Sequence, residues 1–283
     1  MTNIDLKLMA RFLKFLATDG LITETGVDHY DTLTLGYFNL GEFLDSTNWK
    51  NPTDKDVSAF KLDFKTDLHY FDWITRPENK FQLEAFHNHM KFKTLGEKWY
   101  QTVPLEEILR KGTDQNEVLL VDVGGGSGHD LIGFHKHNPG IPGRLILQDL
   151  PETIQTLNVD EMKPIEPMGH NFFTPQSVQY AKAYYLKMVL HDWPDSQGVE
   201  ILKNLKPAMK PGYSKILINE IVIPETDADW FSTSVDILMM VVHSSAERRE
   251  KEWRALIESA GLSVVKIWTC GSASEKLVEV ELP

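Results

Sequence analysis

The segment Glu117–Gly128, with the sequence EVLLVDVGGGSG, constrains the fold of this chain more than any other stretch. Apolar residues around Asp122, followed by three consecutive glycines, predict a buried parallel strand that ends in a tight turn. Glycines at positions 124, 125, 126 and 128 carry no Cβ atoms that would block a ligand, and the helix predicted from about His129 directs its first N–H groups at the turn. Strand, turn and helix are typical of the first unit of a doubly wound α/β sheet that binds a cofactor.

The glycine spacing differs from that of a dinucleotide-binding turn. A G-x-G-x-x-G motif counted from Gly124 and Gly126 needs a third glycine where the sequence has His129. This favours an adenosyl cofactor without a pyrophosphate. The next predicted strand, Arg144–Leu147, is followed by Asp149, at the spacing where a strand-end carboxylate accepts both ribose hydroxyls. The glycines alone would also fit a purely structural turn.

Composition excludes several classes of protein. A length of 283 residues with 42% apolar residues predicts one large or two modest globular domains. The net charge of −12 argues against a nucleic-acid partner. The single cysteine, Cys270, excludes a disulfide framework and a cysteine-based zinc site, and it fits a reducing compartment such as the cytoplasm. The longest uninterrupted apolar run, Ile237–Val242, is too short to span a membrane, and we expect no signal peptide.

The first hundred residues predict a smaller domain. Residues Asp5–Asp19 have apolar side chains at helical spacing, and two short strand patterns, Leu21–Glu24 and His29–Leu35, follow around a turn. Helix and hairpin together predict a winged-helix unit, whose few basic residues make it a poor DNA-binding candidate. We therefore predict domains at residues 1–100 and 101–283.

Residues 36–100 are rich in aromatic side chains and turn formers, which predicts short helices joined by loops. Two interpretations of the aromatic set stay open: a flat, apolar substrate pocket, or ordinary core packing. The set comprises Trp73, Phe86, His87, Met90, Phe92 and Trp99. A helix predicted over Val103–Arg110 then leads into the strand before the glycine turn.

Three later segments carry candidate site residues. In the loop after Pro167, Asn171 can accept from an adenine amine while Phe172 lies against its ring, although a loop that merely packs on the sheet fits equally well. The strand Ala183–Leu190 contains Lys187 and places His191 at its carboxyl end, where a neutral imidazole can accept a proton from a hydroxyl group. A lone histidine is more often structural.

The C-terminal part completes the α/β pattern. We expect a helix over Ser196–Met209, a strand over Lys215–Ile218 with Glu220 at its end, and a terminal hairpin of Ser263–Trp268 with Lys276–Glu281. Glu220 and Glu247 are candidates to orient His191, although each carboxylate alone is more often a solvated charge.

With these residues in view, the chain resembles a fungal member of the S-adenosylmethionine-dependent O-methyltransferases of the caffeate and flavonoid type. The matching segments occur in order over essentially the whole chain: VDVGGGSG from Val121, LQDLP from Leu147, YLKMVLHDWPD from Tyr185 and AER from Ala246. The resemblance implies an α/β fold, with a Rossmann-like methyltransferase sheet and an N-terminal winged-helix and helical domain.

The resemblance also implies a role for each candidate residue. S-adenosyl-L-methionine would contact Gly124, Gly125, Asp149, Asn171, Phe172 and Lys187. His191 would be the general base, Glu220 and Glu247 would hold it, and Met90, Met239 and Met240 would clamp the substrate. The implied reaction methylates a hydroxyl of a small aromatic or polyketide-type secondary metabolite and needs no metal.

Several departures from the family leave alternatives open. Asn171 stands where the family usually has Asp, and His87 stands where Asn is expected in the substrate-covering helix. The sequence begins close to the winged helix, without the N-terminal helices through which relatives dimerise, so we expect a truncated form of a homodimer or a different oligomer. Fungal relatives that catalyse dehydration or pericyclic reactions provide a second reading of the activity. A non-catalytic winged-helix regulator is a third.

Overall fold

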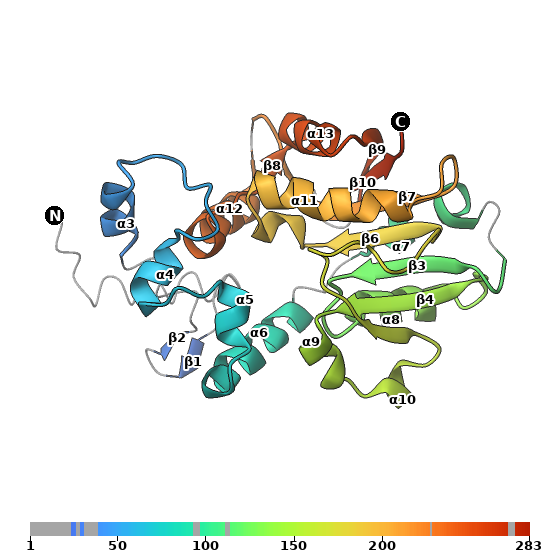
Figure 1. Cartoon of the computed structure of the whole chain (residues 1–283), viewed down its shortest axis with the longest axis horizontal. Helices are drawn as coiled ribbons and strands as arrows, with labels where there is room; N and C mark the ends of the chain where they lie inside the picture. Colours follow the sequence, from blue (N-terminus) through green and yellow to red (C-terminus); the bar gives the residue numbers. More distant parts are fainter. Residues whose placement is uncertain are drawn as a thin grey trace. The chain divides into compact units, whose positions relative to one another are not determined.

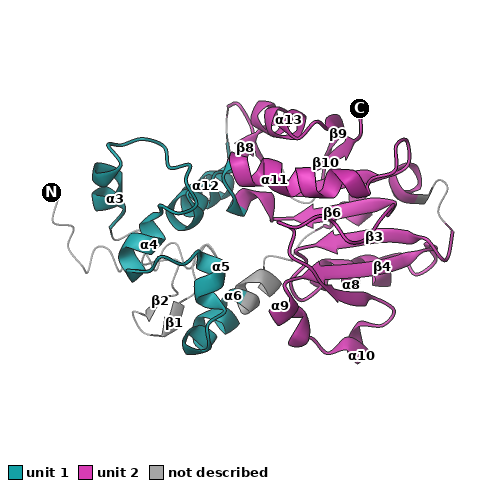
Figure 2. Cartoon of the chain, viewed as in Figure 1, with its two compact units in different colours: residues 1–94, 192–194, 228–247 teal, residues 95–191, 195–227, 248–283 magenta. Residues whose placement is uncertain are grey.

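The computed structural model describes residues 24–26, 29–30, 39–92, 97–110, 114–226, 228–270 and 275–283. The chain divides into two compact units, which Figure 2 colours separately. Unit 1 comprises residues 1–94, 192–194 and 228–247, and unit 2 comprises residues 95–191, 195–227 and 248–283. The assignment of residues 1–100 and 101–283 to two functional domains stays a prediction.

Unit 2 contains a mixed eight-stranded sheet with helices along it, which confirms the predicted Rossmann-like α/β class (Figure 1). Its main path runs β5-β4-β3-β6-β7-β10-β9, and β8 pairs with the end of β7. The strands are β3 Val118–Val123, β4 Arg144–Asp149, β5 Glu166–Gly169, β6 Ala183–Lys187, β7 Lys215–Ile223, β8 Arg248–Arg249, β9 Ser263–Thr269 and β10 Glu275–Glu281.

The strand order reverses at β3. The chain runs from β3 outward through β4 to β5 on one side, and β6 and β7 extend the sheet on the other. All of these neighbours pair in parallel, so their carboxyl ends lie along one edge. In open α/β sheets, ligands bind at the point where the strand order reverses. The glycine turn follows β3 at this point.

The end of β7 differs from the sequence-based prediction. The expected strand Lys215–Ile218 runs on to Ile223, because β10 pairs antiparallel with β7 through Ile221 and β8 pairs with its last residues. Glu220 therefore lies within a strand rather than after one. The predicted terminal hairpin is confirmed, with β9 and β10 paired antiparallel.

Helices pack on the sheet of unit 2 through apolar side chains that alternate along its strands. One core cluster joins Trp99 and Phe134 to Tyr185 of β6. The preceding Tyr184 is also buried, and its hydroxyl lies within hydrogen-bond distance of two backbone carbonyls. The helices of unit 2 are α7 Trp99–Thr102, η2 Glu106–Arg110, α8 His129–His137, α9 Pro151–Gln155, α10 Val159–Met162, α11 Asp195–Leu205, η4 Lys206–Ala208 and α13 Glu250–Ser259.

The continuous helix predicted over Val103–Arg110 is wrong. Helix α7 ends at Thr102, Val103 has extended backbone, and only a five-residue π-helix, η2, follows. Pro104 lies between the two helices, and proline has no backbone N–H to continue a helical ladder. The predicted helices that begin at about His129 and Ser196 are confirmed as α8 and α11.

Unit 1 is built from short helices. They are α3 Leu40–Ser46, α4 Ala59–Phe64, α5 Tyr70–Ile74, η1 Pro77–Asn79, α6 Lys80–Phe92 and α12 Trp230–His243. Side chains cap three of them: Ser58 accepts from the Lys61 N–H at α4, His69 from the Phe71 N–H at α5, and Asp229 from the Ser232 N–H at α12. Such caps satisfy backbone donors that a helix start leaves unpaired.

The N-terminal predictions are only partly covered by the described residues. Strands β1 Glu24–Gly26 and β2 His29–Tyr30 pair antiparallel, which agrees with the predicted hairpin. The predicted helix Asp5–Asp19 lies outside the described residues, so the winged-helix assignment stays a prediction. Within the described ranges, no helix has the length and apolar character needed to cross a membrane.

Candidate functional site

The candidate site of unit 2 lies along the carboxyl edge of its parallel strands. The glycine turn follows β3, Asp149 is the last residue of β4, and Asn171 follows β5. Lys187 is the last residue of β6, and a short 3-10 helix, η3 Leu190–Asp192, carries His191 just beyond it. Five strands therefore contribute predicted residues to one edge, with β7 supplying Glu220.

The glycines of the turn serve different purposes. Gly124, Gly126 and Gly128 have φ angles of +73°, +57° and +73°, which residues with a Cβ rarely adopt. A Cβ on Gly125 would lie 2.5 Å from the Asp122 carboxyl group, so the absence of a side chain at Gly125 is a packing requirement. A Cβ on Gly126 would meet nothing within 4 Å. Open space for a ligand therefore lies at Gly126, whereas the turn is closely packed at Gly125.

Asp149 is already fixed in a geometry that suits a ribose. Its Oδ2 accepts the Gly126 N–H at 2.8 Å and its Oδ1 accepts the Leu150 N–H at 2.8 Å. A carboxylate oxygen has two lone-pair sites, so each oxygen keeps one for a further donor. The residues present therefore fit an adenosyl cofactor: a strand-end carboxylate with remaining acceptor capacity lies beside an open glycine.

Asn171 and Phe172 lie on the same edge. Asn171 is exposed, and its Oδ1 accepts the Phe173 N–H at 2.9 Å, which closes a local turn. The half-buried Phe172 ring lies 3.5 Å from the position that a Cβ on Gly124 would occupy. The structure thus brings Phe172 to the glycine turn, whereas the Asn171 acceptor already has one backbone partner.

Lys187 belongs to a buried polar network beneath the turn. Its Nζ lies 3.0 Å from Asp130 Oδ1 and 3.9 Å from Glu275 Oε1, and the Tyr185 hydroxyl donates to Asp130 Oδ2 at 2.6 Å. Burial lowers the pKa of Lys187, but the negative charges of Asp130 and Glu275 outweigh it and raise that pKa overall. Lys187 is therefore a charged, positioned donor at neutral pH.

Sequence reasoning assigned no role to Asp122 and Asp130. Asp122 is 2% exposed, and in the described part of the structure its Oδ2 has no hydrogen-bond partner. Burial, followed by the charges of Asp130 and Asp149, raises the pKa of Asp122 well above its usual value. The only sequence signals were an acid within an apolar strand and an acid in the first turn of a helix. Neither pattern reveals that the charge of Asp130 acts on Asp122.

His191 and Glu220 lie close together in unit 2. His191 is 4% exposed, and its Nδ1 lies 4.0 Å from Oε2 of the fully buried Glu220. Glu220 is itself fixed, because its Oε1 accepts the backbone N–H groups of Val189 at 3.0 Å and Leu190 at 2.8 Å. The carboxylate thus holds the two residues before His191 and directs its second oxygen at the imidazole.

Arg248 holds the same segment from another side. Its Nη1 donates to the Leu190 carbonyl at 2.9 Å, and its Nε donates to Asp195 Oδ1 at 2.8 Å. The guanidinium also lies 5.1 Å from the centre of the Trp253 ring, which is a cation–π distance. Arg248 occurs in a family-like motif, but no local pattern connects it to Leu190, 58 positions away.

The remaining predicted site residues belong to unit 1, so their grouping with His191 stays a prediction. Glu247 is buried, and its backbone N–H donates to Asp236 Oδ1 at 2.9 Å. Met239 is buried and Met240 half-buried on α12. Met90 lies on α6, with its side chain outside the described part.

The predicted aromatic set does not act as one group. Trp99 is 1% exposed and stacks on Phe134 with ring centres 5.6 Å apart, so it is a core residue of unit 2. Trp73 belongs to unit 1, where it packs edge-on against Phe60. A substrate pocket that includes Trp99 is therefore not supported.

Comparisons with known proteins show the family to which this chain is similar. A family model described as an O-methyltransferase domain matches residues 81–263. Methyltransferase cfoC of Aspergillus candidus is 37% identical over 99% of this chain and 75% of its own length. Demethylsterigmatocystin 6-O-methyltransferase of Aspergillus flavus is 37% identical over 94% of this chain and 73% of its own length.

Two solved structures extend the comparison. LepI in complex with SAM is 31% identical, with a TM-score of 0.79, over 99% of this chain and 77% of that chain. A structure described as a pericyclic reaction enzyme matches with the same identity and coverage and a TM-score of 0.78. The similar proteins thus include named O-methyltransferases and one described as a pericyclic reaction enzyme.

Proposed function

This chain belongs to the O-methyltransferase family, and we propose that it methylates a hydroxyl of a small aromatic or polyketide-type secondary metabolite, with His191 as general base. S-adenosylmethionine supplies the electrophilic methyl group when it is bound. The observation that carries the proposal is the His191–Glu220 pair at the carboxyl edge, beside the β6 and β7 strands.

The distance between Nδ1 and Glu220 supports different proposed tasks for the two ring nitrogens. Nδ1 faces the Glu220 carboxylate, so Nε2 is the nitrogen that accepts the substrate's hydroxyl proton. The negative charge of Glu220 offsets the positive charge that the imidazole gains. Glu247 is proposed as a second acid that orients His191.

The cofactor would be held by the residues along the same edge. Asp149 would accept the ribose hydroxyls, Gly124 and Gly125 would lie under the cofactor, and Phe172 would cover the adenine. Asn171 and Lys187 complete the proposed cofactor set, and Met90, Met239 and Met240 the proposed substrate clamp. Holding the substrate oxygen in line with the methyl group contributes up to about 7–11 kcal/mol in well-oriented reactions.

A variant of His191 tests the role of the base. With S-adenosylmethionine and a panel of phenols and aromatic polyketides, we expect His191→Ala to form S-adenosylhomocysteine about 10²–10⁴ times more slowly than the parent. Calorimetry should show little change in cofactor affinity, because the base acts on the substrate. The control is His137→Ala, a change of an exposed histidine on α8. A His191→Ala variant with parental turnover would rule out the general base.

A pericyclic or dehydration reaction is the second candidate function, supported by the similar pericyclic reaction enzyme. On that reading the positive sulfonium would polarise the substrate without being consumed. The retained His191 and Glu220 favour methyl transfer, because proton removal from an attacking hydroxyl needs such a base.

A further inference from the structure

Helix α5 begins with an unusual cap, the side chain of His69. The backbone N–H of Phe71 donates to His69 Nδ1 at 3.4 Å. A backbone amide can only donate, so Nδ1 must carry a lone pair and no proton. The single ring proton of a neutral imidazole is then on Nε2. The helix start therefore sets the tautomer of His69.

This tautomer propagates to a second histidine. His69 Nε2 lies 3.4 Å from Nδ1 of His243, the last residue of α12. Because His69 Nε2 carries the proton, it donates, and His243 Nδ1 must accept. The proton of His243 is therefore on Nε2, which lies 3.4 Å from Asp192 Oδ1. One direction of donation runs from His69 through His243 to the Asp192 carboxylate.

Ring packing holds this hydrogen-bond relay of His69, His243 and Asp192 in place. The His69 ring stacks on Trp193 with centres 4.4 Å apart and planes 11° from parallel. The His243 ring lies 5.3 Å from Phe71 and meets the edge of Tyr70 at 5.5 Å. His243 and Asp192 are 3% and 9% exposed. Two consecutive residues, Asp192 and Trp193, are thus each held by one histidine ring.

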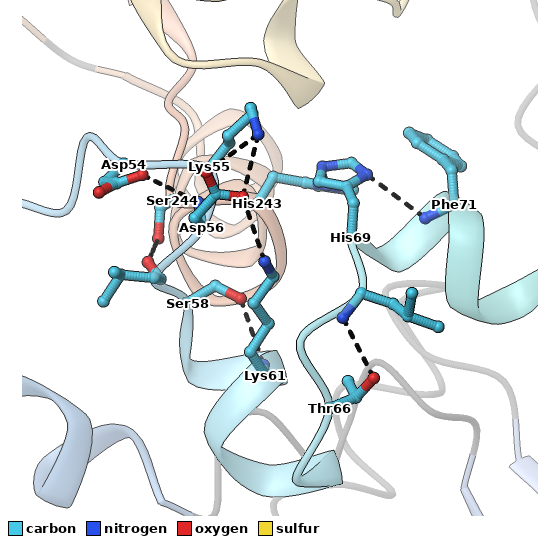
Figure 3. Close-up of polar contacts among 12 residues, drawn as sticks. Asp54, Lys55, Asp56, Ser58, Lys61, Thr66, His69, Phe71, His243 and Ser244 are labelled. Carbon is cyan, nitrogen blue, oxygen red and sulfur yellow. Dashed lines mark hydrogen bonds and ion pairs between the residues drawn. The ribbon is translucent and has the colours of Figure 1, made fainter.

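Burial and two nearby positive charges keep His69 neutral. Burial is the main cause that lowers the pKa of His69 to about 4, followed by the positive charges of Lys61 and Lys55, with Asp56 acting in the opposite direction. Figure 3 shows these residues with His69 and His243. Lys55 and Lys61 both pair with Asp56, and the backbone carbonyl of Val57 accepts from Ser244, the residue after His243. Both ends of the histidine pair are anchored within unit 1.

We propose that His69 and His243 are positioning residues for the reaction, because they fix the two residues that directly follow His191. Asp192 is covalently joined to His191, so a hydrogen bond to its carboxylate and a stacked ring on Trp193 limit the freedom of the backbone after the base. Glu220 and Arg248 restrain the backbone before it. This inference rests on the proposed general-base role of His191.

The first experiment determines which ring nitrogen of His69 and His243 carries the proton, and it needs no substrate. Long-range ¹H–¹⁵N spectra of the whole chain, with His69→Gln and His243→Gln for assignment, should show both rings as neutral Nε2–H tautomers at pH 7. His69 should stay neutral until the pH approaches 4. A protonated Nδ1 on either ring at pH 7 would overturn the relay.

The second experiment tests whether the relay restrains the backbone at His191. His243→Phe keeps a ring beside Phe71 and Tyr70 but removes both hydrogen bonds, whereas the amide of His243→Gln can accept from His69 and donate to Asp192. Hydrogen exchange at the amides of residues 191–193 should speed up in the Phe variant and return toward the parental rate in the Gln variant. Exchange in β3 should not change in either variant.

Kinetics then separate positioning from simple structural support. With a phenol that the parent methylates, His243→Phe should lower kcat about 10–100-fold, while KM for S-adenosylmethionine stays within about twofold. His243→Gln should recover most of kcat, and the control His137→Gln should match the parent. Parental kcat in His243→Phe, together with an inactive His191→Ala, would overturn the inference and leave the general base intact. Full activity in His191→Ala would instead refute the proposed function itself.

Discussion

Asp149 has a structural task and a proposed binding task in one carboxylate. Its two oxygens close the glycine turn and the start of the following loop through backbone N–H groups, and each keeps a lone pair for a ribose hydroxyl. Hydrogen bonds to a charged group contribute about 1.5–3 kcal/mol each. We therefore expect Asp149→Ala to bind S-adenosylmethionine at least about tenfold more weakly in calorimetry.

A matched variant separates the two tasks of Asp149. Asp149→Asn keeps one oxygen acceptor without the negative charge, so its cofactor affinity should fall between those of the parent and Asp149→Ala. Thermal denaturation without cofactor reports the structural task alone. Equal affinities in all three proteins would show that the cofactor does not contact Asp149. A parent that binds NAD in preference would show that S-adenosylmethionine is the wrong cofactor.

At the scale of the elements, β7 and β8 hold the His191 segment. Arg248 of β8 donates to the Leu190 carbonyl from a buried position, so Arg248→Met leaves that carbonyl without this donor. An unsatisfied buried backbone group costs about 1–3 kcal/mol. We expect a loss of that size in the free energy of unfolding from urea titration, and a fall of about tenfold in kcat, because the segment before His191 loosens.

The salt-bridge partner of Arg248 provides the control. The Asp195 side chain is 77% exposed, and exposed ion pairs contribute about 0–1 kcal/mol. Asp195→Asn should therefore leave both stability and kcat close to the parental values. If the two variants lost the same stability and activity, the ion pair and not the Leu190 contact would be the important one.

Local patterns predicted the carboxyl edge well. The glycine turn, Asp149 and His191 each follow a short apolar run, and a parallel sheet necessarily brings the ends of such runs to one edge. The patterns failed where a distant partner decides the outcome. β7 extends past Ile218 because β10 and β8 pair with it, and His69 meets His243 across 174 positions. Trp99 could not be assigned to core or pocket until Phe134 was found stacked on it.

At the scale of the whole molecule, family membership identifies the cofactor, whereas proteins of similar fold differ in the reaction they catalyse. The chain is an S-adenosylmethionine-dependent O-methyltransferase by its family, and its relatives include named fungal O-methyltransferases. A similar fold also occurs in a pericyclic reaction enzyme. Proteins of similar fold therefore carry out two chemistries, which differ in what happens to the methyl group.

The fate of the cofactor is the last prediction. Methyl transfer must produce one S-adenosylhomocysteine for each methylated product, because the methyl group leaves the sulfur for the substrate oxygen; in the proposed reaction His191 takes the hydroxyl proton. Mass spectrometry of cofactor and product, with a panel of phenols and aromatic polyketides, should show this one-to-one ratio. A heat-inactivated sample is the control for spontaneous loss of the methyl group. Turnover that leaves S-adenosylmethionine intact, with product mass unchanged or reduced by one water, would establish the pericyclic or dehydration chemistry instead.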